Sequence, residues 1–162
     1  MPKILISACL LGQKVRYDGN DCLQTHAKLQ ALIKSGDVIP ICPEMAGGLP
    51  TPRPPAEIKN ALTGTDVLNG KAEIRTIDGM DVTIQFVKGA YKALDLVREH
   101  NIRVAILKAQ SPSCGSTQIY NGDFSNTLIS GMGVTAALLS QYGVRVFDEY
   151  HIDEAFKFIE SI

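Results

Sequence analysis

The run Val104-Ala105-Ile106-Leu107 continues through Lys108-Ala109-Gln110 into Ser111-Pro112-Ser113-Cys114-Gly115. A short apolar run that breaks into proline, glycine and serine is typical of a buried parallel strand that ends in a loop. We therefore expect Cys114 just beyond the carboxyl end of that strand. The same pattern, an apolar run followed by a cysteine, can be sought in the rest of the chain.

Two other cysteines have similar surroundings. Cys9 follows the apolar run of residues 3–8, and Cys42 follows Val38-Ile39-Pro40-Ile41. In an open parallel sheet the carboxyl ends of the strands share one edge, where ligands bind. We predict that Cys9, Cys42 and Cys114 meet there in one metal or cluster site. Three separate buried thiols remain the alternative, because paired Cys-x-x-Cys spacings are absent.

Short apolar runs alternate with amphipathic segments along the whole chain. Strands are expected at 3–8, 38–41, 104–107 and 144–147, and helices at 25–34, 81–100, 131–142 and 152–162. This alternation predicts an α/β fold with a single-domain, Rossmann-like, mostly parallel sheet flanked by helices. The turn pairs Asn69-Gly70 and Asp78-Gly79 punctuate residues 57–81, which we expect to form a small β-hairpin outside this sheet.

The composition favours one compact unit. The chain has 162 residues, of which 45% are hydrophobic and 20% charged, so residues 1–162 are predicted to form a single domain. The formal net charge of -1 gives no broad attraction to nucleic acid or to a membrane surface. We expect no secretory leader and a cytoplasmic location. In a reducing compartment, four cysteines are metal ligands, catalytic groups or buried thiols rather than disulfides.

The segment 42–55 is rich in proline and is expected to form a stiff loop without regular structure. It carries Glu44 two residues after Cys42. A carboxylate held near a metal can act as a general base, whereas a plain surface glutamate is the alternative. Arg53, in the same segment, is a candidate substrate-binding residue that could also pair with an acidic neighbour.

Two serines lie just before Cys114. The hydroxyls of Ser111 and Ser113 could donate to a bound anion or sulfur, although serines in turns commonly bond nearby backbone groups. Ser113 is a second candidate for substrate binding. The polar segment 13–22, which contains Cys22, is expected to lie over the strand ends. Gly131-Met132-Gly133 could bind an anion, but no nucleotide-binding fingerprint is present.

Four groups of residues together resemble the small bacterial thiouracil desulfidase (TudS-like) family. They are Ser7-Ala8-Cys9-Leu10-Leu11-Gly12 with Arg16-Tyr17-Asp18-Gly19, Cys42-Pro43-Glu44 with Gly47-Gly48-Leu49 and Thr51-Pro52-Arg53, Lys108 with Ser111-Pro112-Ser113-Cys114-Gly115, and Gly131-Met132-Gly133-Val134-Thr135. The resemblance covers essentially the whole chain, and all four motifs are intact.

The resemblance implies an enzyme with an oxygen-sensitive [4Fe-4S] cluster held by Cys9, Cys42 and Cys114. One iron would lack a protein ligand and bind the sulfur of a 4-thiouracil-like thiocarbonyl, whose hydrolysis would release hydrosulfide. In family terms Glu44 is the acid/base group, and Ser111 is a polar group beside the open iron. The expected partner is a small thiolated nucleobase or nucleoside, with no long nucleic acid and no membrane.

Two other functions are compatible with the same residues. One is a metal-stabilised binding module for a thiolated metabolite or a partner protein, in which the cysteines serve folding. The other is a sulfur transferase that carries a persulfide on Cys114 or Cys22. Besides a role as sulfur acceptor, Cys22 could be an alternative ligand or a spare, partly buried thiol.

Overall fold

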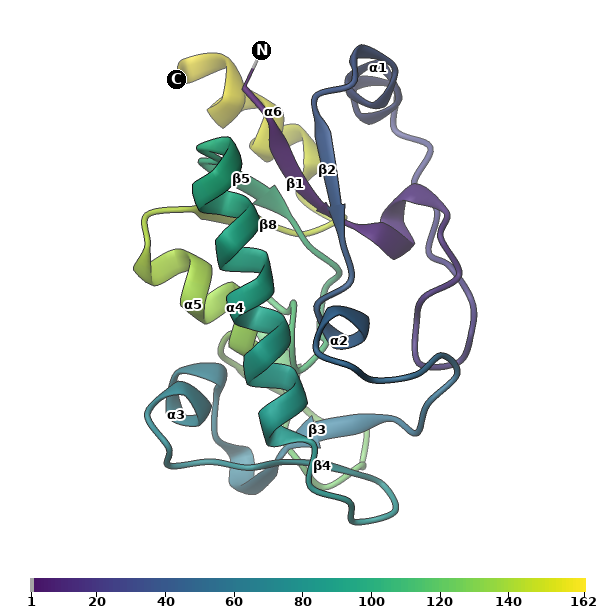
Figure 1. Ribbon diagram of the computed structural model, residues 1–162, viewed down its shortest axis with the longest axis vertical. Helices are drawn as coiled ribbons and strands as arrows, with labels where there is room; N and C mark the ends of the chain where they lie inside the picture. Colours follow the sequence, from purple (N-terminus) through teal and green to yellow (C-terminus); the bar gives the residue numbers. More distant parts are fainter. Residues whose placement is uncertain (1) are drawn as a thin grey trace.

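Four short strands form the central sheet of the computed structural model, which describes residues 2–162. The strands are parallel and lie in the order β2-β1-β5-β8 (Figure 1). They are β1 (Ile4–Ser7), β2 (Val38–Ile41), β5 (Val104–Ile106) and β8 (Arg145–Phe147). The chain moves outward from β1 to β2 and then crosses to β5 on the other side. This reversal creates a topological switch point beside β1, where ligands bind in open α/β sheets.

Helices cover both faces of this sheet, which confirms the predicted α/β class. Leu5 and Ala105 pack on one face together with α4 and α5, whereas Ile4, Ile6 and Ile106 pack on the other with α1 and α6. These helices are α1 (Ala27–Ser35), α4 (Thr83–His100), α5 (Val134–Gln141) and α6 (Ile152–Ser161). Because both faces are buried, the central strands are continuous apolar runs rather than alternating ones.

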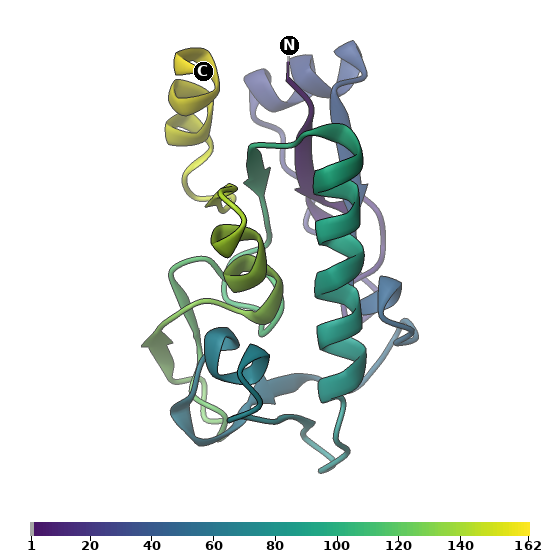
Figure 2. The ribbon, with the colours of Figure 1, turned by 60° about the vertical axis from the view of Figure 1, so that its left-hand side comes forward.

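The longest helix, α4, runs along the sheet in Figures 1 and 2. The Asp81 carboxylate accepts the backbone N–H of Thr83 at 2.9 Å and so satisfies one free amide of the first turn, although Val82 occupies the N-cap position. Asn101 ends the helix in the left-handed conformation. The helix expected over 81–100 is therefore confirmed, with its start two residues later. Within residues 2–162, no helix combines the length and the apolar character needed to cross a membrane.

Two small antiparallel pairs lie outside the parallel sheet. The first pairs β3 (Ala56–Ile58) with β4 (Ile74–Thr76), and its connection contains the 3-10 turn η2 (Lys59–Ala61) and α3 (Gly64–Leu68). It confirms the predicted hairpin. The second pairs β6 (Gln118–Tyr120) with β7 (Leu128–Ser130) and was missed. Strands of three residues are too short to show a period of two.

The proline-rich segment 42–55 is not wholly irregular, as we had expected it to be. Residues Pro43–Ala46 form one helical turn, α2, because proline is tolerated at the first position of a helix. This turn packs backbone to backbone against α4. A Cβ atom on Gly89 would lie 1.9 Å from the carbonyl oxygen of Pro43, and one on Gly47 would lie 1.9 Å from that of Gln85. The two glycines therefore permit the close approach of α2 to α4.

Candidate active site

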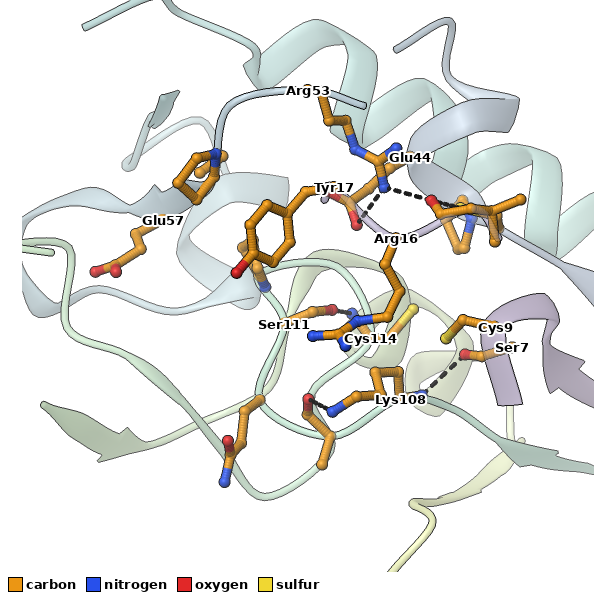
Figure 3. A pocket seen from close by; sticks show the side chains of 18 of the residues that line it. Ser7, Cys9, Arg16, Tyr17, Glu44, Arg53, Glu57, Lys108, Ser111 and Cys114 are labelled. Atoms are coloured by element: carbon orange, nitrogen blue, oxygen red, sulfur yellow. Dashed lines mark hydrogen bonds and ion pairs between the residues drawn. The ribbon is translucent and has the colours of Figure 1, made fainter. Parts of the chain in front are cut away.

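A cavity of about 390 Å³ lies at the carboxyl ends of β1, β2 and β5. Cys9, Cys42 and Cys114 all line it, so the predicted convergence of the three cysteines is confirmed. In Figure 3 the Cys9 and Cys114 side chains point toward one another. The cysteines are 33 and 72 residues apart along the chain, by the differences of their numbers (42 − 9 and 114 − 42), and only the sheet brings them together.

Each cysteine is positioned by the element that follows its strand. Cys9 lies in η1 (Ala8–Leu11), a 3-10 turn that starts directly after β1. Cys42 is the residue before α2, and its thiol donates to the carbonyl of Val15 at 3.7 Å. Cys114 lies in the turn beyond β5, and its N–H donates to the Ser111 hydroxyl at 2.7 Å. The three thiols are thus presented by backbone segments with defined partners.

The Cys114 turn is fastened to the start of α5. The N–H groups of Gly133, Val134 and Thr135 donate to carbonyl oxygens of Gly115, Pro112 and Ser113 at 2.8 Å each. A Cβ atom at position 133 would lie 2.5 Å from the carbonyl carbon of Ser113, so glycine is required for this contact. These three amides at the start of α5 are therefore occupied within the protein and are not free for the anion that the Gly131-Met132-Gly133 segment could have bound.

Burial raises the pKa of all three thiols. The pKa of Cys9 rises to about 12 through burial, with further contributions from the neighbouring Cys22 and Cys42. The pKa of Cys114 also rises to about 12, through burial and then through Glu44, Cys42 and Cys9. Burial also raises the pKa of Cys42, and Glu44 adds to the effect. Without a metal the thiols are therefore neutral, and a metal must displace their protons to bind.

Glu44 and Arg53 form an ion pair at the cavity wall, 3.4 Å from Oε2 to Nη2 (Figure 3). Arg53 is almost fully buried and donates to the carbonyls of Pro50 and Val15 at 3.1 and 3.0 Å. Burial raises the pKa of Glu44, and the positive charge of Arg53 opposes this increase. Arg53 thus pairs with an acidic neighbour, one of the two possibilities that the sequence left open.

The two serines before Cys114 have different positions. Ser111 lines the cavity, whereas Ser113 is fully buried outside it. The Ser113 and Thr135 hydroxyls are 2.7 Å apart and hydrogen-bonded. Ser113 is therefore not among the residues that the structure brings to the cavity, and its bond to Thr135 connects the Cys114 turn to α5.

Several cavity residues were not among the predicted site residues, although they belong to the motifs that carry the family resemblance. Arg16 and Tyr17 come from the polar segment 13–22, which lies over the strand ends as expected: the N–H of Arg53 donates to the Tyr17 carbonyl at 2.7 Å. Lys108 also lines the cavity. Its place two residues after β5, in the same motif as Ser111 and Cys114, was the sequence clue. Cys22 is half-buried beside Cys9, whose carbonyl accepts the Cys22 N–H at 2.8 Å.

The three cysteine thiols suit a metal cluster better than a single metal ion. Within the described residues 2–162, no three histidine, cysteine or acidic side chains are close enough to hold a single metal ion. An iron–sulfur cluster binds its cysteine thiolates through several irons, so its ligands need not converge on one atom. Three thiols around one cavity fit that requirement, and they leave a fourth ligand position without a cysteine.

Comparisons with known proteins agree on one family. Residues 4–151 match the 2-thiouracil desulfurase family. The chain is 48% identical over 151 residues to the uncharacterized protein YbbK of Bacillus subtilis (strain 168), and the match covers 93% of this chain and 98% of that protein. A solved structure of the [4Fe-4S]-dependent thiouracil desulfidase TudS has a TM-score of 0.90 and 44% identity, with both chains covered completely. The chain belongs to the 2-thiouracil desulfurase family.

Proposed function

We propose that this protein is a [4Fe-4S]-dependent desulfidase that replaces the sulfur of a thiolated pyrimidine with oxygen from water. One observation carries the proposal: cysteines from three strand ends line the same cavity as the Glu44–Arg53 ion pair. Family membership and the 44% identity to TudS support the substrate class and the cofactor. In this function Cys9, Cys42 and Cys114 hold the cluster.

When bound, the cluster would supply a Lewis-acidic iron without a protein ligand for the thiocarbonyl sulfur. The reaction needs no electrons, because R₂C=S and H₂O give R₂C=O and H₂S, which ionises to hydrosulfide and a proton. Water adds to the carbon and must lose protons as it does so. The protein therefore needs a group that accepts a proton beside the thiocarbonyl.

Glu44 is that group in our proposal. Its carboxylate lines the cavity, and burial brings its pKa closer to the working pH than that of an exposed glutamate. Arg53 holds the carboxylate from the outer side, 3.4 Å away. Glu44 thus accepts a proton from water at its free oxygen and returns it to solvent or to the departing sulfur.

Ser111 and Arg53 orient the reactants. The Ser111 oxygen accepts the Cys114 N–H at 2.7 Å, which leaves the hydroxyl proton to donate to substrate or water. Arg53 uses its two terminal nitrogens within the protein, but its buried Nε has no hydrogen-bond partner among the described residues. Because Arg53 lines the cavity, we keep in this proposal the substrate contact that the sequence predicted for its side chain.

The test is anaerobic reconstitution with iron and sulfide, followed by iron analysis, cluster absorbance and conversion of 4-thiouracil with release of sulfide. Serine variants of Cys9, Cys42 and Cys114 should lose the cluster absorbance and the activity, whereas Cys22→Ser serves as the matched control and should retain both. Glu44→Gln should keep the cluster and lose activity by about 10²-fold or more.

The alternatives predict other results. A metal-stabilised binding module would show no turnover in any variant, and Glu44→Gln would leave ligand binding unchanged. A persulfide transferase would remain active without iron and would carry an extra sulfur detectable by mass spectrometry. Wild-type protein that binds no iron under these conditions, or that turns over without it, overturns the proposed function.

A further inference from the structure

Lys108 lies at the end of β5 and extends its side chain along the cavity wall. Its N–H donates to the Ser7 hydroxyl at 2.8 Å, which ties the β5 end to the β1 end. The side chain is mostly buried, and the ammonium lies 2.9 Å from the Glu149 carboxylate. The ammonium also donates to the carbonyl of Ala109 at 3.2 Å. Lys108 is therefore a fixed cation rather than a mobile surface lysine.

Glu149 holds this cation from outside the cavity. Its side chain is 3% exposed, follows β8 and does not line the cavity, whereas Lys108 does. One carboxylate oxygen accepts the Ala109 N–H at 2.7 Å, and the other faces the ammonium. A lysine ammonium has three donors, and Glu149 and Ala109 use two of them, so one donor of this cavity-lining residue has no partner among the described residues. The Glu149 carboxylate also keeps Lys108 protonated, since it raises the pKa of that lysine against burial.

The cavity wall around Lys108 carries positive charge next to the thiols. Lys108 and Arg16 both act electrostatically on Cys9. Arg16 has no acidic side chain within ion-pair distance in the part of the chain that the structure describes. In Figure 3 the side chains of Arg16 and Lys108 are drawn near those of Cys9 and Cys114. Arg53 pairs with Glu44 and Glu149 pairs with Lys108, so what Lys108 can offer an anion that forms during the reaction is the ammonium hydrogen that Glu149 and Ala109 leave unused.

We propose that Lys108, positioned by Glu149, binds the sulfur that leaves the substrate as an anion. This inference rests on the proposed function. As oxygen from water bonds to the carbon, the π pair of the C=S double bond moves to the sulfur. When this adduct collapses to C=O, the remaining carbon–sulfur bond breaks with its pair on the sulfur, which leaves as hydrosulfide with one of the two water protons. The other proton goes to Glu44 and then to solvent. A fixed donor aimed at this developing charge lowers the barrier without reorganising.

The experiment compares Lys108→Met and Lys108→Arg with Lys157→Met, a matched control on the exposed side of α6. Lys108→Met should lower kcat about 10²-fold with little change in KM, and Lys108→Arg should recover most of the loss because the charge is retained. In a separate measurement, sodium sulfide is titrated into the anaerobic cluster-loaded protein and followed by cluster absorbance. The apparent Kd for sulfide should rise about 10-fold in Lys108→Met.

Glu149→Gln tests the positioning role and also serves if Lys108→Met fails to fold. Glutamine still accepts the Ala109 N–H but no longer holds the ammonium, so kcat should fall about 10-fold with the cluster intact. Glu160→Gln, which removes the exposed partner of Lys28, is its matched control and should have no effect.

The outcomes separate the two proposals. If wild-type protein turns over and Lys108→Met or Glu149→Gln does so equally, the inference is overturned and the desulfidase function stands. The inference also fails if Lys108→Met loses turnover but binds sulfide as wild-type protein does, or if it binds sulfide more weakly without loss of kcat. If wild-type protein neither loads nor turns over, the proposed function itself fails.

Discussion

The Arg53 guanidinium and the Glu44 carboxylate lie 3.4 Å apart at the wall of the cysteine-lined cavity. The same guanidinium donates to the carbonyl of Val15, in the segment over the strand ends, and to the carbonyl of Pro50. One buried side chain thus joins two loops and the carboxylate that we propose as the proton acceptor. Removing it should affect both stability and the ionisation of Glu44.

Arg53→Met should move the acid limb of the pH–rate profile to higher pH. Burial raises the pKa of Glu44 and Arg53 opposes that increase, so without Arg53 the carboxylate needs a higher pH to ionise. The free energy of unfolding should fall by about 3 kcal/mol, because a buried carboxylate and main-chain acceptors lose their partner. Arg75→Met, at an exposed ion pair with Glu73, should cost less than about 1 kcal/mol. An unchanged acid limb would count against Glu44 as the base.

Ser113→Ala should lower stability and leave KM nearly unchanged. The Ser113 hydroxyl is buried and hydrogen-bonded to the Thr135 hydroxyl at 2.7 Å. Its removal leaves the buried Thr135 hydroxyl without this partner and should lower the free energy of unfolding by about 1–2 kcal/mol. The double variant Ser113→Ala/Thr135→Val should be more stable than the sum of the single changes predicts. Urea unfolding and steady-state kinetics check both statements. A large increase in KM without loss of stability would restore the substrate contact first predicted for Ser113.

Gly89→Ala should destabilise the protein, although this change ordinarily stabilises a helix interior by about 1 kcal/mol. The added Cβ atom would lie 1.9 Å from the carbonyl oxygen of Pro43, so α2 must move away from α4. We expect a loss of about 1–3 kcal/mol and reduced turnover, because α2 carries Glu44. The neighbouring exposed change Lys88→Ala is the control. Thermal unfolding that shows Gly89→Ala to be neutral or stabilising would refute the backbone contact.

His151 should make the stability depend on pH. The Asp148 carboxylate, 2.6 Å from the His151 Nδ1, raises the pKa of His151 above its ordinary value of 6.5. The stabilisation is therefore complete below pH 6.5 and is lost as the pH rises through the higher pKa of the folded state. The measurement is the difference in free energy of unfolding between wild-type protein and His151→Gln. This difference should decrease between pH 6 and 9. The decrease should be less than about 1 kcal/mol, because the ring is partly exposed. A pH-independent difference would exclude the ion pair.

The sequence by itself determined the sheet and the place of the cysteines. Continuous apolar runs such as residues 104–107 can be buried on both faces only in a parallel sheet covered by helices. Cys9, Cys42 and Cys114 each follow such a run, and the carboxyl ends of parallel strands share an edge, so their meeting follows from local pattern and general topology. The helices α1, α4 and α6 followed from their apolar period in the same way, whereas α2 and α3 did not.

Only the tertiary structure decided which polar groups face one another. Glu149 is 41 residues from Lys108 (149 − 108), and no local pattern joins them until β5 and β8 pair. The direction of Ser113 depends on the start of α5, against which its turn is packed. Hydrophobic periodicity is a property of neighbours along the chain, whereas hydrogen bonds and ion pairs require angles and distances of a few ångströms that the packing of distant elements sets.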